Sequence, residues 1–465
     1  RFVTSTFRSA GFTVVDLYDE DDDLQAAIKN GRSMTGDAVC APLAAVSGDV
    51  MTAIEDFKRR RQKDPLFAGK RRLLVFNNTG DGPCRQGQYV EAHKIFLDRQ
   101  EKSSGKEHAG ELIMQFLVGH EDIGYDFGLP RWLFMRTAQA IILQGVLHDL
   151  LARGSSRCRD YDDYRAFIRA YRALKAEVYD YLEHRTRPAP AALRFAKRTE
   201  KTPGLNYLVN YFAWGLHRRD LQRMLKGFAK KWCSPPLPEE ASRIHVDGEA
   251  YMRIAQFEQI DRALLATLGF RQFELTHTPV WSFLDYKIAG MQLHARETIS
   301  ENLEALQHAG QAATRKKLRA LRRDQQKRLV SLKAVQFLLR EVLAKPLYRS
   351  ANLRMPESME NILEVAGTVI PTKRPHGELL PYIGEALLKL RDGYDLVLNV
   401  APEGCMVSSM GEAITPGIHA AAPGANGKIQ HLFSQQGDID RELIALALLK
   451  TIGPERYYRQ ASPDS

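Results

Sequence analysis

A short apolar run that ends in a glycine-rich loop with a cysteine constrains the fold of this chain more than any other feature. Leu73–Phe76 has the length and composition of a buried strand. The loop Thr79–Tyr89, TGDGPCRQGQY, follows it, and its glycines and proline predict a tight turn. Ligands of open α/β sheets bind outside the carboxyl ends of strands. Cys84 is therefore expected at such an edge, although a small cysteine buried in a turn is an equally common arrangement.

The composition indicates a globular protein with a large core. The chain has 465 residues, of which 44% are hydrophobic and 26% charged, and this length predicts roughly two to four domains. We expect a piece of a longer polypeptide, because the chain begins at Arg1 inside a predicted helix, Arg1–Ala10. The net charge of +10 permits anionic partners such as nucleic acid or phosphate-rich small molecules.

The cysteine count and the hydropathy bear on location. Five cysteines are too few for a disulfide framework in a chain of this length. Without a secretory signal they favour reduced thiols and a cytoplasmic location. We find no apolar run long enough to cross a bilayer, which predicts no membrane partner.

Alternating strand and helix patterns predict an α/β protein with parallel sheets in two domains. Residues 1–153 are expected to form the first domain, and 154–239 a helical region that ends in a proline-rich linker. Residues 240–458 are expected to form the second domain, with a basic helical insertion at about 295–348. The predicted strands include Leu73–Phe76, Leu112–Val118, Arg243–Val246, Phe270–Leu275, Val369-Ile370, Asp395–Val400 and Ile429–Ser434.

Three cysteines occupy equivalent loop positions. Cys40 and Cys84 lie in glycine-rich loops of the first domain, and Cys405 follows a strand of the second. Their spacing matches no zinc or ferredoxin motif. Three converging thiolates would suit an iron–sulfur cluster with one iron open to water or substrate. Cys158 and Cys233 have no such turn and are interpreted as structural or surface thiols.

The densest run of positive charge lies in Arg315–Arg328. Four leucines within and just after this run are expected on one helical face, which predicts a half-buried amphipathic helix: Leu318, Leu321, Leu329 and Leu332. A solvated helix is the simplest interpretation, and a face for nucleic acid or an acidic partner is the more specific one. Because no recognition motif or interleaved aromatic residue accompanies the cations, we expect packing and partner docking without specific nucleic-acid binding.

Six motifs in chain order resemble the 2-hydroxyacyl-CoA dehydratase superfamily, and most closely its activase-fused branch of BadF/HgdB-like proteins. They are CAP at Cys40–Pro42, GPCRQGQY at Gly82–Tyr89, GEAYMR at Gly248–Arg253, GEAL at Gly384–Leu387, NVAPEGCMVSS at Asn399–Ser409 and QGD at Gln436–Asp438. This sequence departs from the family at Ala41 and Gln86, where an aromatic residue is usual. These departures leave the substrate open.

The resemblance implies a fold, a cofactor and partners. The family fold is two flavodoxin-like α/β domains plus helical elements, with a 4Fe-4S cluster between them. The three cysteines that match, Cys40, Cys84 and Cys405, would bind that cluster. An ATP-hydrolysing activator, which would lie upstream if it is fused to this chain, injects one electron. The cluster passes it to an acyl-CoA thioester, and the resulting ketyl radical expels a hydroxyl. Two dehydratase-like subunits pair.

The predicted function is therefore that of the electron-accepting component of an ATP-driven reductase or dehydratase system. Arg85 is the candidate for a charge that raises the cluster potential. Glu403, Ser408 and Ser409 are candidates to line the open iron. The alternative is a non-catalytic electron-transfer or scaffold module that docks an acidic partner through its basic helix.

Overall fold

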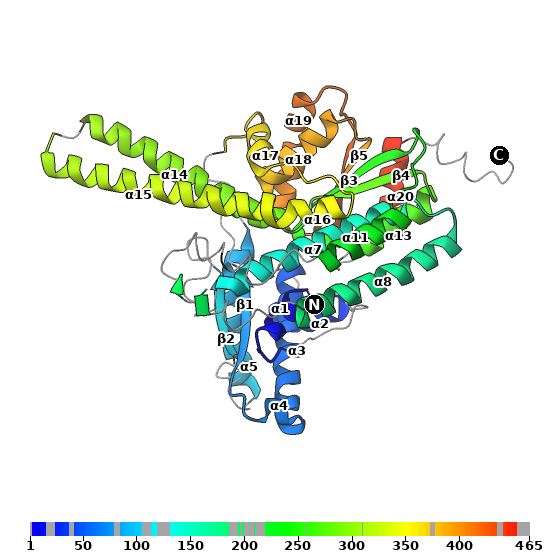
Figure 1. Cartoon of the computed structure of the whole chain (residues 1–465), viewed down its shortest axis with the longest axis horizontal. Helices are drawn as coiled ribbons and strands as arrows, with labels where there is room; N and C mark the ends of the chain where they lie inside the picture. The colour runs from blue at the N-terminus through cyan, green and yellow to red at the C-terminus, as the bar shows by residue number, and fades with distance from the viewer. Residues whose placement is uncertain are drawn as a thin grey trace.

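The strands among the described residues form two parallel sheets of different size (Figure 1). The computed structural model describes residues 2–14, 24–36, 41–78, 84–104, 113–118, 131–185, 194–195, 198–199, 209, 219–255, 257–308, 310–372, 377–434 and 440–452. In the smaller sheet, β1 (Leu73–Asn78) pairs with β2 (Ile113–Val118). The larger sheet has the order β4-β3-β5-β6. The predicted α/β class is confirmed, while its division into two flavodoxin-like domains remains a prediction.

The larger sheet has a crevice built into its topology. Its strands are β3 (Ser242–Gly248), β4 (Phe273–His277), β5 (Leu396–Pro402) and β6 (Ile429–Ser434). Every residue of β5 is buried, as is typical of a parallel strand covered on both faces. The chain leaves β3 for β4 on one side and returns to β5 on the other. The crevice between the carboxyl ends of β3 and β5 is therefore a topological switch point, where ligands bind in sheets of this kind.

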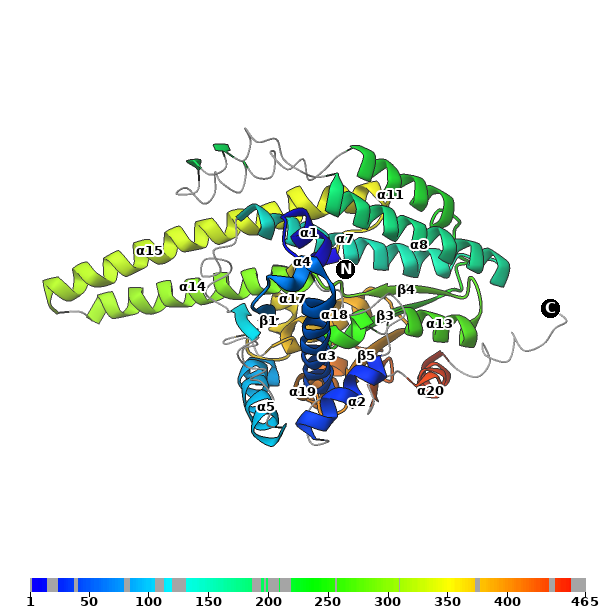
Figure 2. The same cartoon turned by 90° about the horizontal axis from the view of Figure 1, so that it is seen from below.

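Helices cover both faces of the larger sheet (Figure 2). One face carries α7 (Arg131–Ser155), α13 (Phe257–Leu268) and α20 (Arg441–Ile452), and the other α17 (Met359–Ala366), α18 (Leu379–Arg391) and α19 (Met406–Ala421). The core of the first face continues through α8 (Tyr161–His184) and α11 (Arg219–Trp232). Full burial of each large aliphatic side chain contributes about 1.5–3 kcal/mol. None of the described helices combines the length and apolarity needed to cross a membrane.

The smaller sheet has its own helical cover. Its helices are α2 (Leu24–Thr35), α3 (Ala41–Lys63), the short α4 (Pro65–Ala68) and α5 (Tyr89–Ser104), while α1 (Phe2–Ser9) packs on α7 and α8. The helices α2 and α3 cross at Gly31 and Gly48. A Cβ at Gly31 would lie 1.6 Å from the Ala44 carbonyl oxygen, so only glycine permits this approach.

The basic insertion is a hairpin of two long helices. We predicted a basic helical insertion at about 295–348, but α14 (Ser282–His308) begins earlier and turns back into α15 (Ala312–Phe337). The hairpin projects beyond the body of the molecule in both views (Figures 1 and 2). At its base the buried Asp285 carboxylate accepts a hydrogen bond of 2.7 Å from Arg340. A π-helical segment, η2 (Leu338–Ala344), and α16 (Lys345–Ser350) lead back to the body.

Candidate functional site

The turn after β3 lies directly against β5 at the switch point. Gly248 is the last residue of β3 and has a φ of +110°. This backbone conformation is strained for any residue that carries a side chain. A Cβ at Gly248 would lie 2.3 Å from the Val400 carbonyl oxygen of β5. The Glu249 backbone N–H donates to the same oxygen at 2.8 Å. Glycine at residue 248 therefore lets the chain turn from β3 into α12 (Ala250–Ala255) directly over β5.

We expect Gly248→Ala to lower the free energy of unfolding by about 3 kcal/mol, because it combines backbone strain with a clash against a central strand. Gly227→Ala is the matched control. Gly227 lies inside α11 with no neighbour within 4 Å of a built Cβ, so alanine there should stabilise the protein by about 0.5–1 kcal/mol. Urea denaturation of both variants checks the opposite signs. Equal effects would contradict the close approach at Gly248.

Cys405 stands at the carboxyl end of β5 as the N-cap of α19. Burial raises the pKa of the Cys405 thiol to about 11. Hydrogen bonds from the Ser408 backbone and side chain lower it, whereas the negative charges of Glu249 and Cys84 raise it. Cys84 and Cys405, from distant parts of the chain, thus lie close enough for their charges to interact.

Cys84 directly precedes the short helix η1 (Arg85–Gln88), which leads into α5. Its side chain is half-buried, as is that of Cys405. Burial lowers the pKa of Lys287 on α14, while the negative charges of Cys84 and Glu378 raise it. An ammonium group therefore lies near the Cys84 sulfur. We did not predict Lys287 from the sequence, because nothing in its spacing links it to Cys84.

The described cysteines of the site share a position before the first residue of a helix. At Cys405 the positive end of the α19 dipole favours a thiolate, but burial outweighs this effect and the pKa of the thiol is raised. Cys40 lies outside the described residues, and α3 begins at the next residue, Ala41. Among the described residues, no group of three or more His, Cys, Asp or Glu side chains could hold a metal ion. Cys84 and Cys405 are therefore the two candidate thiols that the structure describes.

The two cysteines that we assigned to structure are buried in the helical core. The Cys158 thiol donates to the Gly154 carbonyl oxygen at 3.4 Å, and the Cys233 thiol to the Leu150 carbonyl oxygen at 3.7 Å. Burial raises the pKa of Cys158 to about 12 and that of Cys233 to about 11. Both thiols are therefore protonated at neutral pH and remote from solvent.

The other predicted site residues differ in their exposure and in the groups that they contact. The Arg85 backbone begins η1, and its side chain lies outside the described residues. Glu403 is exposed, and its backbone N–H donates to the Ser434 carbonyl oxygen at 2.8 Å. Ser408 is buried against Cys405. The exposed Ser409 donates its hydroxyl to the Cys405 carbonyl oxygen at 2.9 Å.

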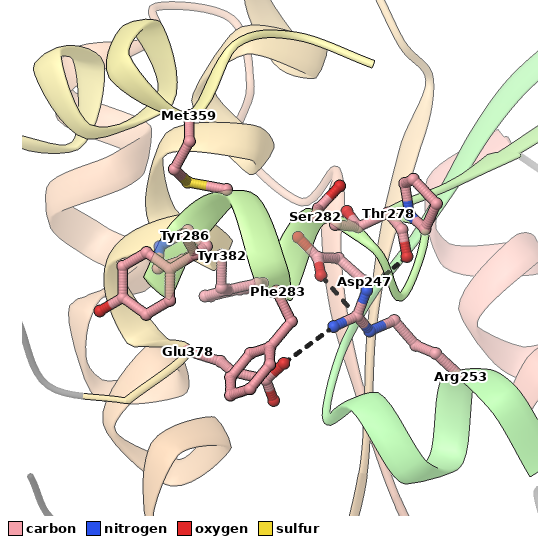
Figure 3. Close-up of a pocket in the computed structure, with 11 residues that line it drawn as sticks. Asp247, Arg253, Thr278, Ser282, Phe283, Tyr286, Met359, Glu378 and Tyr382 are labelled. Carbon is pink, nitrogen blue, oxygen red and sulfur yellow. Dashed lines mark hydrogen bonds and ion pairs between the residues drawn. The ribbon is translucent and has the colours of Figure 1, made fainter. Parts of the chain in front are cut away.

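A small pocket opens beside β3 and β4 and is organised by Arg253 on α12. Figure 3 shows the Arg253 guanidinium between the carboxyl groups of Asp247, at 3.7 Å, and Glu378, at 3.2 Å. Arg253 also donates to the backbone carbonyls of Gly248 and Thr278. The other walls are mostly apolar side chains: Pro279, Phe283, Tyr286, Met359, Pro381 and Tyr382.

Two carboxyl groups share this one guanidinium. Burial raises the pKa of Asp247, and the Arg253 charge only partly offsets this effect. Burial likewise raises the pKa of Glu378, and Arg253 and then the Ala250 N–H and Lys287 lower it. The pocket therefore combines apolar walls with carboxyl groups that hold a proton more firmly than carboxyl groups in water. Such groups can donate a hydrogen bond or a proton to a ligand.

Comparison of the chain with protein-family models, with curated proteins and with solved structures gives no match.

Proposed function

We propose that the chain binds a 4Fe-4S cluster through Cys40, Cys84 and Cys405 and is the electron-accepting component of an ATP-driven, low-potential reductase or dehydratase system. The observation that carries the proposal is the charge interaction between Cys84 and Cys405, which come from distant parts of the chain. The motif resemblance supplies the reaction class. In this proposal the smaller sheet belongs to a second flavodoxin-like domain, and the cluster lies between the two domains.

The donor chemistry of the described residues fits such a group. Both thiols are half-buried, Cys405 precedes the first turn of α19, where a thiolate ligand is favoured, and Lys287 interacts with Cys84 as a positive charge. The raised pKa of Cys405 means that its thiol is protonated at neutral pH without a metal. Cluster binding should therefore release a proton from Cys405.

The residues around the thiols would tune and orient the group. Ser408 would donate hydrogen bonds to the Cys405 sulfur, and Lys287 would balance negative charge near Cys84. When bound, the cluster would take up one low-potential electron and pass it to a thioester or similar acceptor. Lys287 interacts with both Cys84 and Glu378, and in this proposal the pocket organised by Arg253 would take the acyl part of that acceptor against its apolar walls. The electron donor would be an ATP-dependent activator, fused upstream or separate.

Anaerobic reconstitution with ferrous iron and sulfide tests the cluster. After desalting, we expect bound iron and acid-labile sulfide in equal amounts and an electron paramagnetic resonance signal on reduction. A protein that retains neither would contradict the proposal. Addition of a 2-hydroxyacyl-CoA to the reduced protein tests the acceptor separately. An unchanged signal would rule out the thioester as the acceptor and would not contradict the cluster.

A further inference from the structure

The α14–α15 hairpin is an arm whose outer half does not pack on the body (Figures 1 and 2). At a rise of 1.5 Å per residue, the 27 residues of α14 and the 26 of α15 each span about 40 Å. The base of the arm is fixed by buried contacts: Asp285 with Arg340, and Gln292 with Gln336 at 2.7 Å. Beyond that base, the two helices mainly contact each other.

The arm carries a concentrated positive charge. The formal charge of α15 is +8, and most of its cations are exposed. Among the residues that the structure describes, none of the cations from Lys316 to Lys333 forms an ion pair with a carboxylate. Ion pairs that stabilise the fold therefore do not account for the positive charge of α15.

The seam between the two helices uses a different face of α15. Leu318, Leu329 and Leu332 are half-buried there, as we predicted from the sequence. Leu321, which we assigned to the same face, is 44% exposed, so the cover of this face is incomplete there.

Exposed apolar side chains accompany the cations on α15. Val330 is 69% exposed and Phe337 is 59% exposed. These two residues are seven positions apart, so they lie on one helical face. Arg323 and Lys327 precede Val330 by seven and three positions and extend the same face toward the tip of the arm. One continuous face thus changes from apolar near the body to cationic farther out.

We propose that this face of α15 docks a separate protein with an acidic surface beside an apolar patch. The positive charges of Arg323 and Lys327 are complementary to an acidic surface on the partner. The exposed Val330 and Phe337 favour a protein over a nucleic acid as the partner. Apolar contacts anchor protein interfaces, whereas the phosphate backbone of a nucleic acid has no apolar group to contact these side chains. The inference is independent of the proposed cluster.

Direct binding tests the docking face, with a fluorescent helical peptide of glutamate and leucine as the protein-like probe. A DNA duplex and a single-stranded RNA of equal charge are the competing probes, and anisotropy is measured at about 0.15 M salt. We expect the peptide to bind more tightly than either nucleic acid. The double variant Arg323→Glu/Lys327→Glu should weaken peptide binding by on the order of tenfold or more. Val330→Ser/Phe337→Ser should weaken peptide binding and leave nucleic-acid binding unchanged.

Lys226→Glu/Lys230→Glu on α11 is the matched control, because these exposed lysines have the same spacing of four residues. This control should bind the peptide as the unmodified chain does. Circular dichroism of each variant verifies that the helices are intact. Tighter binding of a nucleic acid than of the peptide would overturn the proposal in favour of a nucleic-acid face. No peptide binding, or equal loss in the α11 control, would also overturn it.

Discussion

Serine in place of Cys84 or Cys405 is expected to remove most of the iron from the reconstituted protein. A hydroxyl at neutral pH is a far weaker iron ligand than a thiolate, and a cluster that loses one of three protein ligands is poorly held. The same change at Cys40 should have the same effect, since the proposal counts three equivalent ligands. Iron and sulfide analysis after anaerobic desalting measures each variant.

Cys158→Ser and Cys233→Ser are the matched controls. Both thiols are buried in the helical core and bonded to backbone carbonyl oxygens, which a serine hydroxyl can also bond. We expect these two variants to keep their iron and to melt close to the unmodified chain. Equal iron loss from the controls and from Cys84→Ser would show that the wrong thiols were chosen.

Local signals in the sequence were sufficient for elements with clear ends. The sequence pattern predicts a helix over Tyr161–His184, and α8 has these bounds because the Asp160 side chain caps it by accepting from the Asp163 N–H at 2.8 Å. The pattern also predicts a helix over Met359–Ala366. The helix α17 has these bounds, and the Ser358 hydroxyl caps it by accepting from the Asn361 N–H at 3.2 Å. Short polar side chains at N-caps are readable in a sequence because the bonds they make are local.

Local signals failed where tertiary contacts decide. Val369-Ile370, predicted as a short strand, forms a turn because both residues donate backbone hydrogen bonds to the Ala366 carbonyl oxygen. The beginning of α14 was missed because its buried Asp285 and Gln292 look like surface residues until Arg340 and Gln336 pack against them.

The candidate site was predictable in part for the same reason. Cys84 and Cys405 were found because each has a glycine turn after a strand, and such turns can be read locally. The approach of Lys287 to Cys84, and the sharing of Arg253 by two carboxyl groups, join residues far apart in the sequence. Nothing in the spacing of these residues encodes their contact, so only the structure could assign them.

Arg253→Met is expected to be among the most destabilising single changes at this site. It leaves the carboxyl groups of Asp247 and Glu378 buried without their shared cation, and breaking a buried pair in this way costs about 3–5 kcal/mol. Arg165→Met is the matched control. The Arg165 side chain is 70% exposed and its ion pair with Asp162 is 3.7 Å long, so its loss should cost at most about 1 kcal/mol.

The cost of Arg253→Met should depend on pH. The folded-state pKa values of Asp247 and Glu378 are raised above their unfolded values, so the folded protein binds more protons and loses stability as pH rises through the folded pKa values. Removing the guanidinium raises both pKa values further, which enlarges that loss. Near pH 4, carboxyl groups of the unfolded chain also begin to bind protons. Arg253→Met should therefore lower the free energy of unfolding by less at that pH than at about pH 8. Urea denaturation at both values measures this difference. A deficit that is the same at both, or as small as that of Arg165→Met, would contradict a guanidinium that offsets buried negative charge.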